Sequence, residues 1–305
     1  MEYVIETQGL TKRYGASAVV DDVGLHVPRG SIYGLLGRNG AGKTTTMKLL
    51  LQLARPTAGR IRLFGEDCAK EQRKTYRRIG SIIETPGFYE NLTAYENLRL
   101  LARLRGCVEE GQIRSALHTV GLQKERKKPF SDYSLGMKQR LGIAAAIMHA
   151  PELLILDEPI NGLDPIGIAE IRTFLSELSR ERGTTILISS HVLSEIEQIA
   201  DVVGVMHTGR LIQETDMAAL HRHKRRYTVF HVSDAAKGTA LLREVCGVTD
   251  CAAEENVIRI YDPIPDRGEV NRVLVENGLH VTHISVVEET LEDYFSDLIG
   301  GGGIA

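Results

Sequence analysis

The sequence predicts an α/β protein in which a domain built on a parallel sheet is followed by a smaller α+β domain. The first observation is a glycine-rich segment at residues 37–44, between an apolar strand and a helix. The second is a pair of near-continuous apolar runs, 153–156 and 184–190, typical of central strands in a parallel sheet covered on both faces. The third is a change of composition near residue 221, after which strand-like and helix-like segments alternate.

Composition is that of an ordinary soluble globular protein. The chain has 305 residues, 43% hydrophobic and 25% charged, with a net charge of −3. This charge balance does not favour a nucleic-acid partner, which would call for a basic surface. No stretch approaches the roughly 18 uncharged apolar residues of a membrane helix, and the start MEYVIETQ lacks the features of a signal peptide. We therefore expect a cytosolic protein, with its four scattered cysteines as free thiols rather than metal ligands or disulfides.

The first third of the chain is expected to contain antiparallel strands and then the start of the parallel sheet. Short alternating segments with turn signals fill Tyr3 to Gly30. Ser31 to Leu36 is a compact apolar strand, and a helix is expected from about Lys43 to Leu53. Ala58 to Phe64 predicts a further strand.

The middle of the chain carries two helical segments and a hairpin. Asn91 to Leu122 has helical periodicity and is expected to be helical throughout. Ser134 is a good N-cap for a helix that runs to about His149. Val202 to Met206 and Arg210 to Gln213 flank a turn and predict a hairpin.

We place the larger domain over residues 1–220, with a helical subdomain at about 86–149, and an accessory domain with a loose tail over 221–305. The basic run at residues 221–226 is interpreted as a solvated linker in preference to a contact with anionic lipid. The accessory domain is expected to hold three strands, two helices and a final helix. They are strands Tyr227 to Val232, Val257 to Tyr261 and His280 to Val286, and helices Ala235 to Val245, Gly268 to Asn277 and Leu291 to Ile299.

The clearest motif is G-x-x-x-x-G-K-S/T, a phosphate-binding loop, the P-loop, between a strand and a helix. Glycines allow backbone conformations that a Cβ forbids, and they bring N–H groups close to phosphate oxygens. The helix N-terminus adds partial positive charge. Lys43 would face the β- and γ-phosphates, and the Thr44 hydroxyl would ligate Mg²⁺. Taken alone, the motif could also be a tight structural turn. The nucleotide-binding residues expected here are Gly37, Arg38, Asn39, Gly40, Ala41, Gly42, Lys43, Thr44 and Thr45.

A second motif is the apolar strand at residues 153–156, which ends in two carboxylates. Asp157 is suited to hold Mg²⁺ through a water, and Glu158 is suited to polarise the water that attacks the γ-phosphate. Taken alone, the pair could equally be ordinary surface acids that end a strand. Its position downstream of the P-loop favours the catalytic interpretation.

Three further segments complete an order of motifs that resembles the ATPases of ABC transporters. Ser134 to Arg140 is similar to the signature segment of that family, and Asn161 to Pro165 to its D-loop. His191, after an apolar strand, is similar to its switch histidine. The resemblance covers Tyr3 to about Leu220. It implies a P-loop NTPase fold with a RecA-like core, an antiparallel β portion and a helical subdomain.

The resemblance also implies roles for individual residues. Tyr14 would stack on adenine, and the less favoured alternative is an ordinary half-buried aromatic side chain of a strand. His191 would contact the γ-phosphate as a catalytic residue beside Glu158. Ser134 and Gly136 would contact the γ-phosphate of ATP held by a partner subunit, because two cassettes of this family meet head to tail.

Two positions depart from the common family pattern. The signature has Leu135 and Met137 where the commonest form has glycine and glutamine, so its fine geometry differs while Ser134 and Gly136 are retained. Glu84 stands where the family usually has the glutamine of its Q-loop, and would serve as a metal-side and catalytic residue. Residues 79–98 resemble the bacitracin and lantibiotic-immunity branch of bacterial exporters, and residues 282–296 resemble the ending of drug exporters.

The resemblance implies an ATP- and Mg²⁺-dependent ATPase that acts at the cytoplasmic face of a membrane. It would work as a homodimer, or with a closely related ATPase subunit, and drive a separate membrane permease. We expect export of a peptide antibiotic or another amphipathic compound. Two alternatives stay open. One is an ATPase whose complex mainly senses the drug. The other is a soluble ABC protein, which the single cassette and the lack of heptads disfavour.

Overall fold

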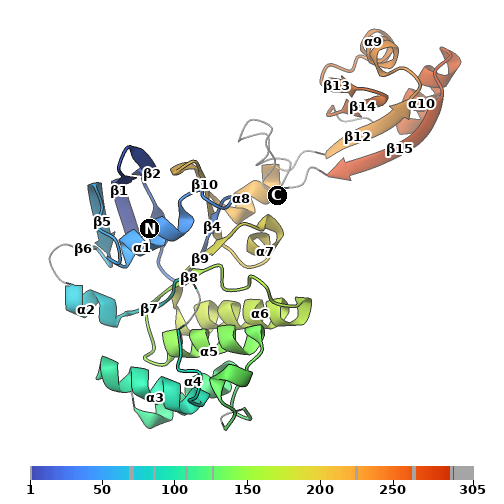
Figure 1. Ribbon diagram of the computed structural model, residues 1–305. Coiled ribbons are helices and arrows are strands. Elements are labelled where there is room, and N and C mark those ends of the chain that lie inside the picture. Colours follow the sequence, from blue (N-terminus) through green and yellow to red (C-terminus); the bar gives the residue numbers. More distant parts are fainter. Residues whose placement is uncertain are drawn as a thin grey trace. The chain divides into compact units, whose positions relative to one another are not determined.

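The computed structural model describes residues 2–68, 72–84, 87–106, 109–125, 127–223, 226–262, 266–288 and 291 (Figure 1). The chain divides between Ala218 and Ala219 into two units, which we call the larger unit and the accessory unit. The division falls two residues before the boundary expected from the sequence and inside helix α8 (Met217–His223). Within the described ranges, no helix is both long enough and apolar enough to span a membrane.

An antiparallel sheet opens the larger unit. Its strand order is β2-β1-β5-β6, and β3 pairs with β1. The pairings of β1 with β2, β3 and β5 are all antiparallel, as the alternating N-terminal segments predict. The strands are β1 (Tyr3–Tyr14), β2 (Ser17–Val23), β3 (His26–Pro28), β5 (Ala58–Leu63) and β6 (Glu66–Asp67).

A six-stranded sheet of order β11-β10-β4-β9-β8-β7 forms the centre of the larger unit. All neighbours in it are parallel except the β10–β11 hairpin, which the sequence also predicts. Its central strands are buried along their whole length, which explains their unbroken apolar sequences. The strands are β4 (Ile32–Leu36), β7 (Ile79–Ile82), β8 (Leu153–Asp157), β9 (Thr185–Ser190), β10 (Val202–His207) and β11 (Arg210–Asp216).

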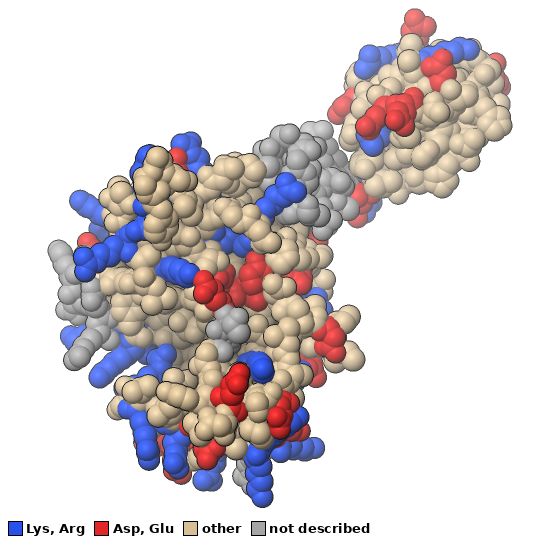
Figure 2. All heavy atoms as spheres, in the orientation of Figure 1, with Lys and Arg blue, Asp and Glu red and all other residues tan. Residues whose placement is uncertain are grey.

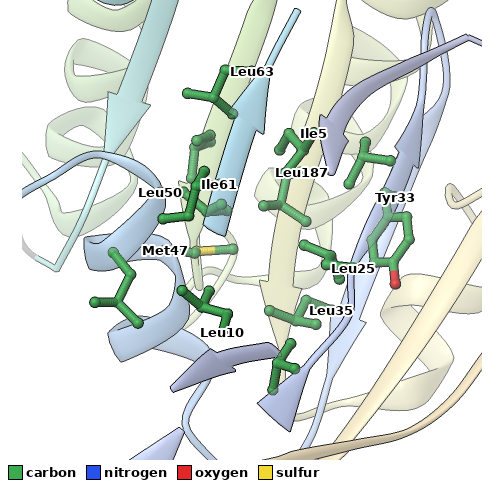
Figure 3. Packing of buried hydrophobic residues seen from close by; sticks show 14 of the residues in the cluster. Ile5, Leu10, Leu25, Tyr33, Leu35, Met47, Leu50, Ile61, Leu63 and Leu187 are labelled. Atoms are coloured by element: carbon green, nitrogen blue, oxygen red, sulfur yellow. The ribbon is translucent and has the colours of Figure 1, made fainter. Parts of the chain in front are cut away.

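Helix α1 (Lys43–Leu50) contributes side chains to a core cluster that also contains residues of both sheets (Figure 3). Met47 and Leu50 of α1 point toward Ile61 of β5, and Leu35 and Leu187 of the parallel sheet complete the cluster. Met47, Leu50 and both sheet leucines are fully buried. Burial of this apolar surface therefore fixes the helix that follows the glycine-rich loop against both sheets at once.

The helical part of the larger unit differs from the expectation for residues 91–122. The sequence predicts one continuous helix there, and the structure has two, α3 (Ala94–Arg105) and α4 (Glu110–Thr119). Helix α3 ends because Gly106 adopts a left-handed conformation with φ 67° and donates its N–H to Ala102 O, as a helix C-cap does. Helical periodicity on both sides of a glycine does not reveal this break.

The remaining helices follow their sequence signals more closely. Ser134 caps the N-terminus of its helix as predicted, and Asp164 caps the long helix that follows β8. No helix is predicted from the sequence at 72–77, 165–182, 193–197 or 217–223, and the last of these includes the start of the expected linker. The helices are α2 (Gln72–Arg77), the 3₁₀ turn η1 (Phe130–Asp132), α5 (Leu135–Ile147), α6 (Pro165–Arg182) and α7 (Leu193–Glu197). Pro86, proposed as the start of the helical subdomain, lies outside the described residues.

The accessory unit has the order β-α-β-β-α-β, and its antiparallel sheet has the strand order β13-β14-β12-β15. This is the split β-α-β arrangement of ferredoxin-like folds. The five expected elements up to residue 286 are present, and β13 is an additional strand whose sequence CAAE shows no apolar alternation. The elements are β12 (Arg226–Val232), α9 (Ala235–Val245), β13 (Cys251–Glu254), β14 (Val257–Ile260), α10 (Arg267–Glu276) and β15 (Val281–Glu288). The final helix expected over residues 291–299 falls outside the described residues apart from Leu291.

Acidic and basic side chains are mixed along the lower edge of the larger unit, over α3 (Figure 2).

We predict that Gly80→Ala will destabilise the larger unit, because a Cβ at Gly80 of β7 would lie 2.1 Å from Ala146 O of α5. Strand and helix would have to separate, at a cost of about 1–3 kcal/mol. Gly111→Ala is the control, since a Cβ at that helical glycine meets nothing within 4 Å. Urea denaturation should show a lower midpoint for Gly80→Ala alone, and equal midpoints for the two variants would contradict this packing.

Candidate functional site

The P-loop connects β4 to α1, and its glycines are required by geometry. Gly40 and Gly42 have φ values of 85° and 103°, in the left-handed region that favours glycine. A Cβ at Gly42 would also lie 2.7 Å from Val19 O, and one at Gly37 would lie 2.5 Å from Met206 O. The backbone of the loop is thus packed against β2 on one side and β10 on the other.

Lys43, the first residue of α1, is only 4% exposed and bends back over the loop. Its Nζ donates to Gly37 O and to Arg38 O, the latter at 3.3 Å. Nζ also lies 3.3 Å from Oε1 of Glu158. A buried ammonium is stable only when it is paired, and these oxygens satisfy it. The lysine of the loop and the acid that directly follows β8 therefore meet in the structure.

Thr44 and Asp157 provide the oxygen atoms of a candidate metal site. Thr44 Oγ1 donates to Asp157 Oδ2 at 2.8 Å, so a hydroxyl from α1 and a carboxylate from β8 converge. Asp157 is 6% exposed, and its other oxygen, Oδ1, accepts a hydrogen bond of 2.7 Å from Ser189 Oγ. Hydroxyl and carboxylate oxygens are the hard ligands that Mg²⁺ prefers. The donor set present here therefore fits that ion.

Glu158 and His191 form a second pair, between the ends of β8 and β9. His191 Nδ1 lies 2.7 Å from Glu158 Oε2, and because a carboxylate only accepts, the imidazole is the donor. Glu158 has a φ of 47°, a left-handed conformation that costs energy for a residue with a Cβ. This backbone geometry turns the carboxylate that follows Asp157 toward His191 and Lys43. The two neighbouring acids consequently have different partners.

Ser189 links the two acids and was missed by the sequence analysis. Its hydroxyl donates to Asp157 Oδ1 and accepts the N–H of Glu158 at 2.9 Å. It is fully buried at the end of β9, directly before Ser190 and His191. Two serines at the end of an otherwise apolar strand were the available signal, because a buried hydroxyl needs partners.

Tyr14 and Glu84, the residues expected at the adenine and at the metal, are both exposed. Tyr14 ends β1, is 55% exposed, and has Lys12 Nζ 4.8 Å from its ring centroid. Its ring is thus open to a flat ligand, as a stacking residue must be. Glu84 pairs with Lys48 of α1, with 2.6 Å between Oε1 and Nζ, and no contact joins it to Thr44 or Asp157 among the interactions of the described residues.

The signature segment, Ser134 to Arg140, caps and begins α5. The contacts of Lys43 and Thr44 described above do not include any of its residues. Ser134 Oγ accepts the N–H of Met137 at 3.3 Å and so caps the helix. The segment instead packs on the D-loop of the same chain: a Cβ at Gly162 would lie 2.8 Å from Leu135 Cδ2, and one at Gly136 would lie 3.4 Å from Leu163 Cδ2. Figure 1 shows α5 beside α6, below β8, while α1 lies among the strands of the two sheets.

The other predicted nucleotide-binding residues belong to the loop itself. Arg38 and Asn39 are exposed at its tip, Ala41 is buried, and Thr45 is half-buried in the first turn of α1. Ala41 O accepts the N–H of Gly209 at 3.0 Å, which ties the loop to the β10–β11 turn.

Comparison with known proteins places the chain among ABC transporter subunits. Residues 20–161 match the family described as ABC transporter. The bacitracin transport ATP-binding protein BcrA of Enterococcus faecalis is 63% identical over 305 residues, covering 100% of this chain and 99% of that protein. The protein of the same name from Bacillus licheniformis is 50% identical, with 100% of both chains covered.

A third relative matches a shorter part of the chain. The lantibiotic transport ATP-binding protein SrtF of Streptococcus pyogenes is 46% identical over 213 residues, covering 70% of this chain and 91% of that protein. Among solved structures, one described as the ATP binding subunit of an ABC transporter has a TM-score of 0.65 and 34% identity. It covers 72% of this chain and 92% of that chain. With relatives matched along its whole length, this chain belongs to the ATP-binding subunits of the ABC transporter family.

Proposed function

We propose that this ATPase powers the export of a peptide antibiotic of the bacitracin type through a separate permease. The single observation that carries the proposal is the match to two bacitracin transport ATP-binding proteins over the full chain, accessory unit included. The resemblance of residues 79–98 to the same branch agrees with it. In this proposal the subunit works at the cytoplasmic face of the membrane, held there by the permease.

The P-loop would bind the phosphates of ATP through its backbone N–H groups and Lys43. The carbonyls of Gly37 and Arg38 now accept from the ammonium, and phosphate oxygens would replace them as acceptors. Thr44 and Asp157 would hold Mg²⁺, which supplies neutralisation of phosphate charge when it is bound. Tyr14, open to solvent at the end of β1, would stack on the adenine.

Glu158 would accept a proton from the water that attacks the γ-phosphate. Its carboxylate is oriented by His191 Nδ1 at 2.7 Å and by the Glu158 N–H bond to Ser189 Oγ. A general base must lie within hydrogen-bond reach of the attacking water. Glu158 Oε1 lies 3.3 Å from Nζ of the lysine that would hold the phosphate, so a water beside that phosphate would be close to the carboxylate. His191 would keep the carboxylate in place and face the same phosphate.

Ser134 and Gly136 would complete the site of a second cassette. The N-terminus of α5 is the positive end of the helix dipole, and the N–H groups of a first helical turn suit a phosphate. Within one chain these groups are held at the D-loop, apart from Lys43 and Thr44. A head-to-tail pair of cassettes, with ATP between them, would bring the signature of one chain to the P-loop of the other.

We predict that Glu158→Gln will lower ATP turnover by about 10²–10⁴-fold while ATP binding is retained. The amide keeps the size of the side chain but cannot accept the proton. A dimer should accumulate with ATP on gel filtration, because the nucleotide that joins the cassettes is not consumed. The control is Glu181→Gln, an exposed acid of α6. Unreduced turnover in Glu158→Gln would remove this residue from catalysis.

We predict that Lys43→Ala and Ser134→Arg will each abolish hydrolysis as purified variants, and that their mixture will regain part of it. In a head-to-tail dimer of the two variants, one site combines both lesions. The other has an intact P-loop and an intact signature. Hydrolysis in the mixture should therefore exceed the sum of the separate variants. If both parts acted within one chain, mixing would restore nothing.

We predict that cells carrying this subunit with its cognate permease will resist bacitracin, and that Glu158→Gln will abolish the resistance. The measurement is the inhibitory concentration of bacitracin, with intracellular or membrane-retained labelled drug followed in parallel. Resistance without removal of the drug would favour the sensing alternative. Wild-type resistance in cells that carry the Glu158→Gln subunit with the permease would contradict the proposal.

A further inference from the structure

An ion pair outside the expected catalytic set joins α1 to the segment that follows β7. Lys48 Nζ donates to Glu84 Oε1 at 2.6 Å. The two side chains come from different parts of the sequence, 36 residues apart. They are 34% and 65% exposed, so water and salt reach the pair and its energy is modest. It is the kind of contact that a stronger competitor can break.

Lys48 lies on the metal side of α1. It follows Thr44 by four residues, so both project from the same face of the helix, one turn apart. The charge of Asp157 also acts on it: the pKa of the Lys48 ammonium is raised first by the hydrogen bond that it donates to Glu84, and further by the charges of Glu84 and Asp157. The ammonium therefore pairs with Glu84 and is also influenced by the charge of the carboxylate of the candidate metal site.

Glu84 is held in an uncommon backbone conformation at the point where the chain leaves the parallel sheet. Its φ is 62°, a left-handed value that a residue with a Cβ adopts only when its surroundings fix it. Residue 84 follows β7, and the chain continues from there to α3. The ion pair with Lys48 is a side-chain contact that fixes this residue to the helix of the P-loop.

We propose that Lys48 is a positioning residue that holds Glu84 in a latch, which Mg²⁺ bound at Thr44 and Asp157 releases. A dication next to Asp157 repels the Lys48 ammonium and attracts Glu84, so the carboxylate exchanges one cation for another. The segment after β7 would then report whether Mg-ATP is bound. This inference rests on the proposed function, because it assigns a regulatory contact to the same ATP site.

The latch makes Mg²⁺ compete with Lys48, and removal of Lys48 should therefore make Mg²⁺ more effective. We predict that Lys48→Met lowers the free Mg²⁺ concentration for half-maximal binding of a fluorescent ATP analogue about two- to fivefold at low salt. The measurement uses the full chain in the Glu158→Gln background, where bound nucleotide is not hydrolysed. The shift should shrink in about 0.5 M salt, because an exposed pair is screened.

A second substitution separates the latch from simple repulsion between Lys48 and the metal. If Lys48 acts through Glu84, Lys48→Met should produce no shift once Glu84→Gln is present. Repulsion alone would leave the shift in place, and that result would overturn the proposal. Lys124→Met is the matched control, since it removes one charge from an exposed turn after α4 and should not change the Mg²⁺ midpoint.

The outcomes also distinguish the latch from the function on which it rests. Equal Mg²⁺ midpoints for Lys48→Met and the wild-type side chain would overturn the latch while leaving the ATPase assignment intact. Nucleotide binding that ignores Mg²⁺ in every variant would contradict the proposed metal site itself. Loss of bacitracin resistance has no bearing on this binding measurement, so failure of the transport proposal would be recognised separately.

Discussion

The close backbone packing around the P-loop is the constraint on which the rest of the site depends. Gly42 and Gly209 both leave room for Val19 O, while Gly37 leaves room for Met206 O. The antiparallel sheet and the parallel sheet therefore converge on one loop, and each contributes a carbonyl that a single Cβ would displace. The loop shape that exposes N–H groups to a phosphate is consequently a product of both sheets. This explains why the N-terminal strands belong to the same unit as the catalytic strands.

Beside that loop, one buried hydroxyl contacts both of the acids at the end of β8, Asp157 and the residue that follows it, Glu158. Ser189 Oγ donates to Asp157 and accepts from the N–H of Glu158. These two hydrogen bonds hold both acids beside Ser189. Asp157 then faces Thr44, while Glu158 faces His191 and Lys43. Neighbouring carboxylates would otherwise repel each other, and separate cationic or donor partners reduce that repulsion. The geometry thus gives the two acids different partners, which suits the separate metal and water roles proposed for them.

The sequence predicts the parts of this site better than their arrangement. The P-loop can be predicted because its glycines, lysine and threonine, at fixed spacing, are each required by local backbone geometry or by chemistry. Strands β4 and β8 can be predicted because burial on both faces makes their sequences continuously apolar. Ser189 was missed because its role depends on a neighbouring strand, which sequence spacing does not show. The break after Arg105 was missed because Gly106 interrupts the helix without interrupting the apolar periodicity. Glu84 was expected at the metal. Its ion pair with Lys48 could not be predicted, because the two residues are 36 positions apart in the sequence and meet only in the fold.

The structure satisfies its charges internally in a way that prepares the site for its ligands. Lys43 is 4% exposed and would be unstable without acceptors, so carbonyls of its own loop and Glu158 now surround it. The Thr44 hydroxyl donates to Asp157, so the two oxygen atoms that would bind a metal ion already lie together. Lys48 neutralises the charge of Glu84. Each of these contacts is one that a phosphate or a divalent cation can replace with a stronger one. Ligand binding then exchanges partners instead of creating buried charges, so the side chains are already close to where they are needed, and the cost of organising them is met during folding.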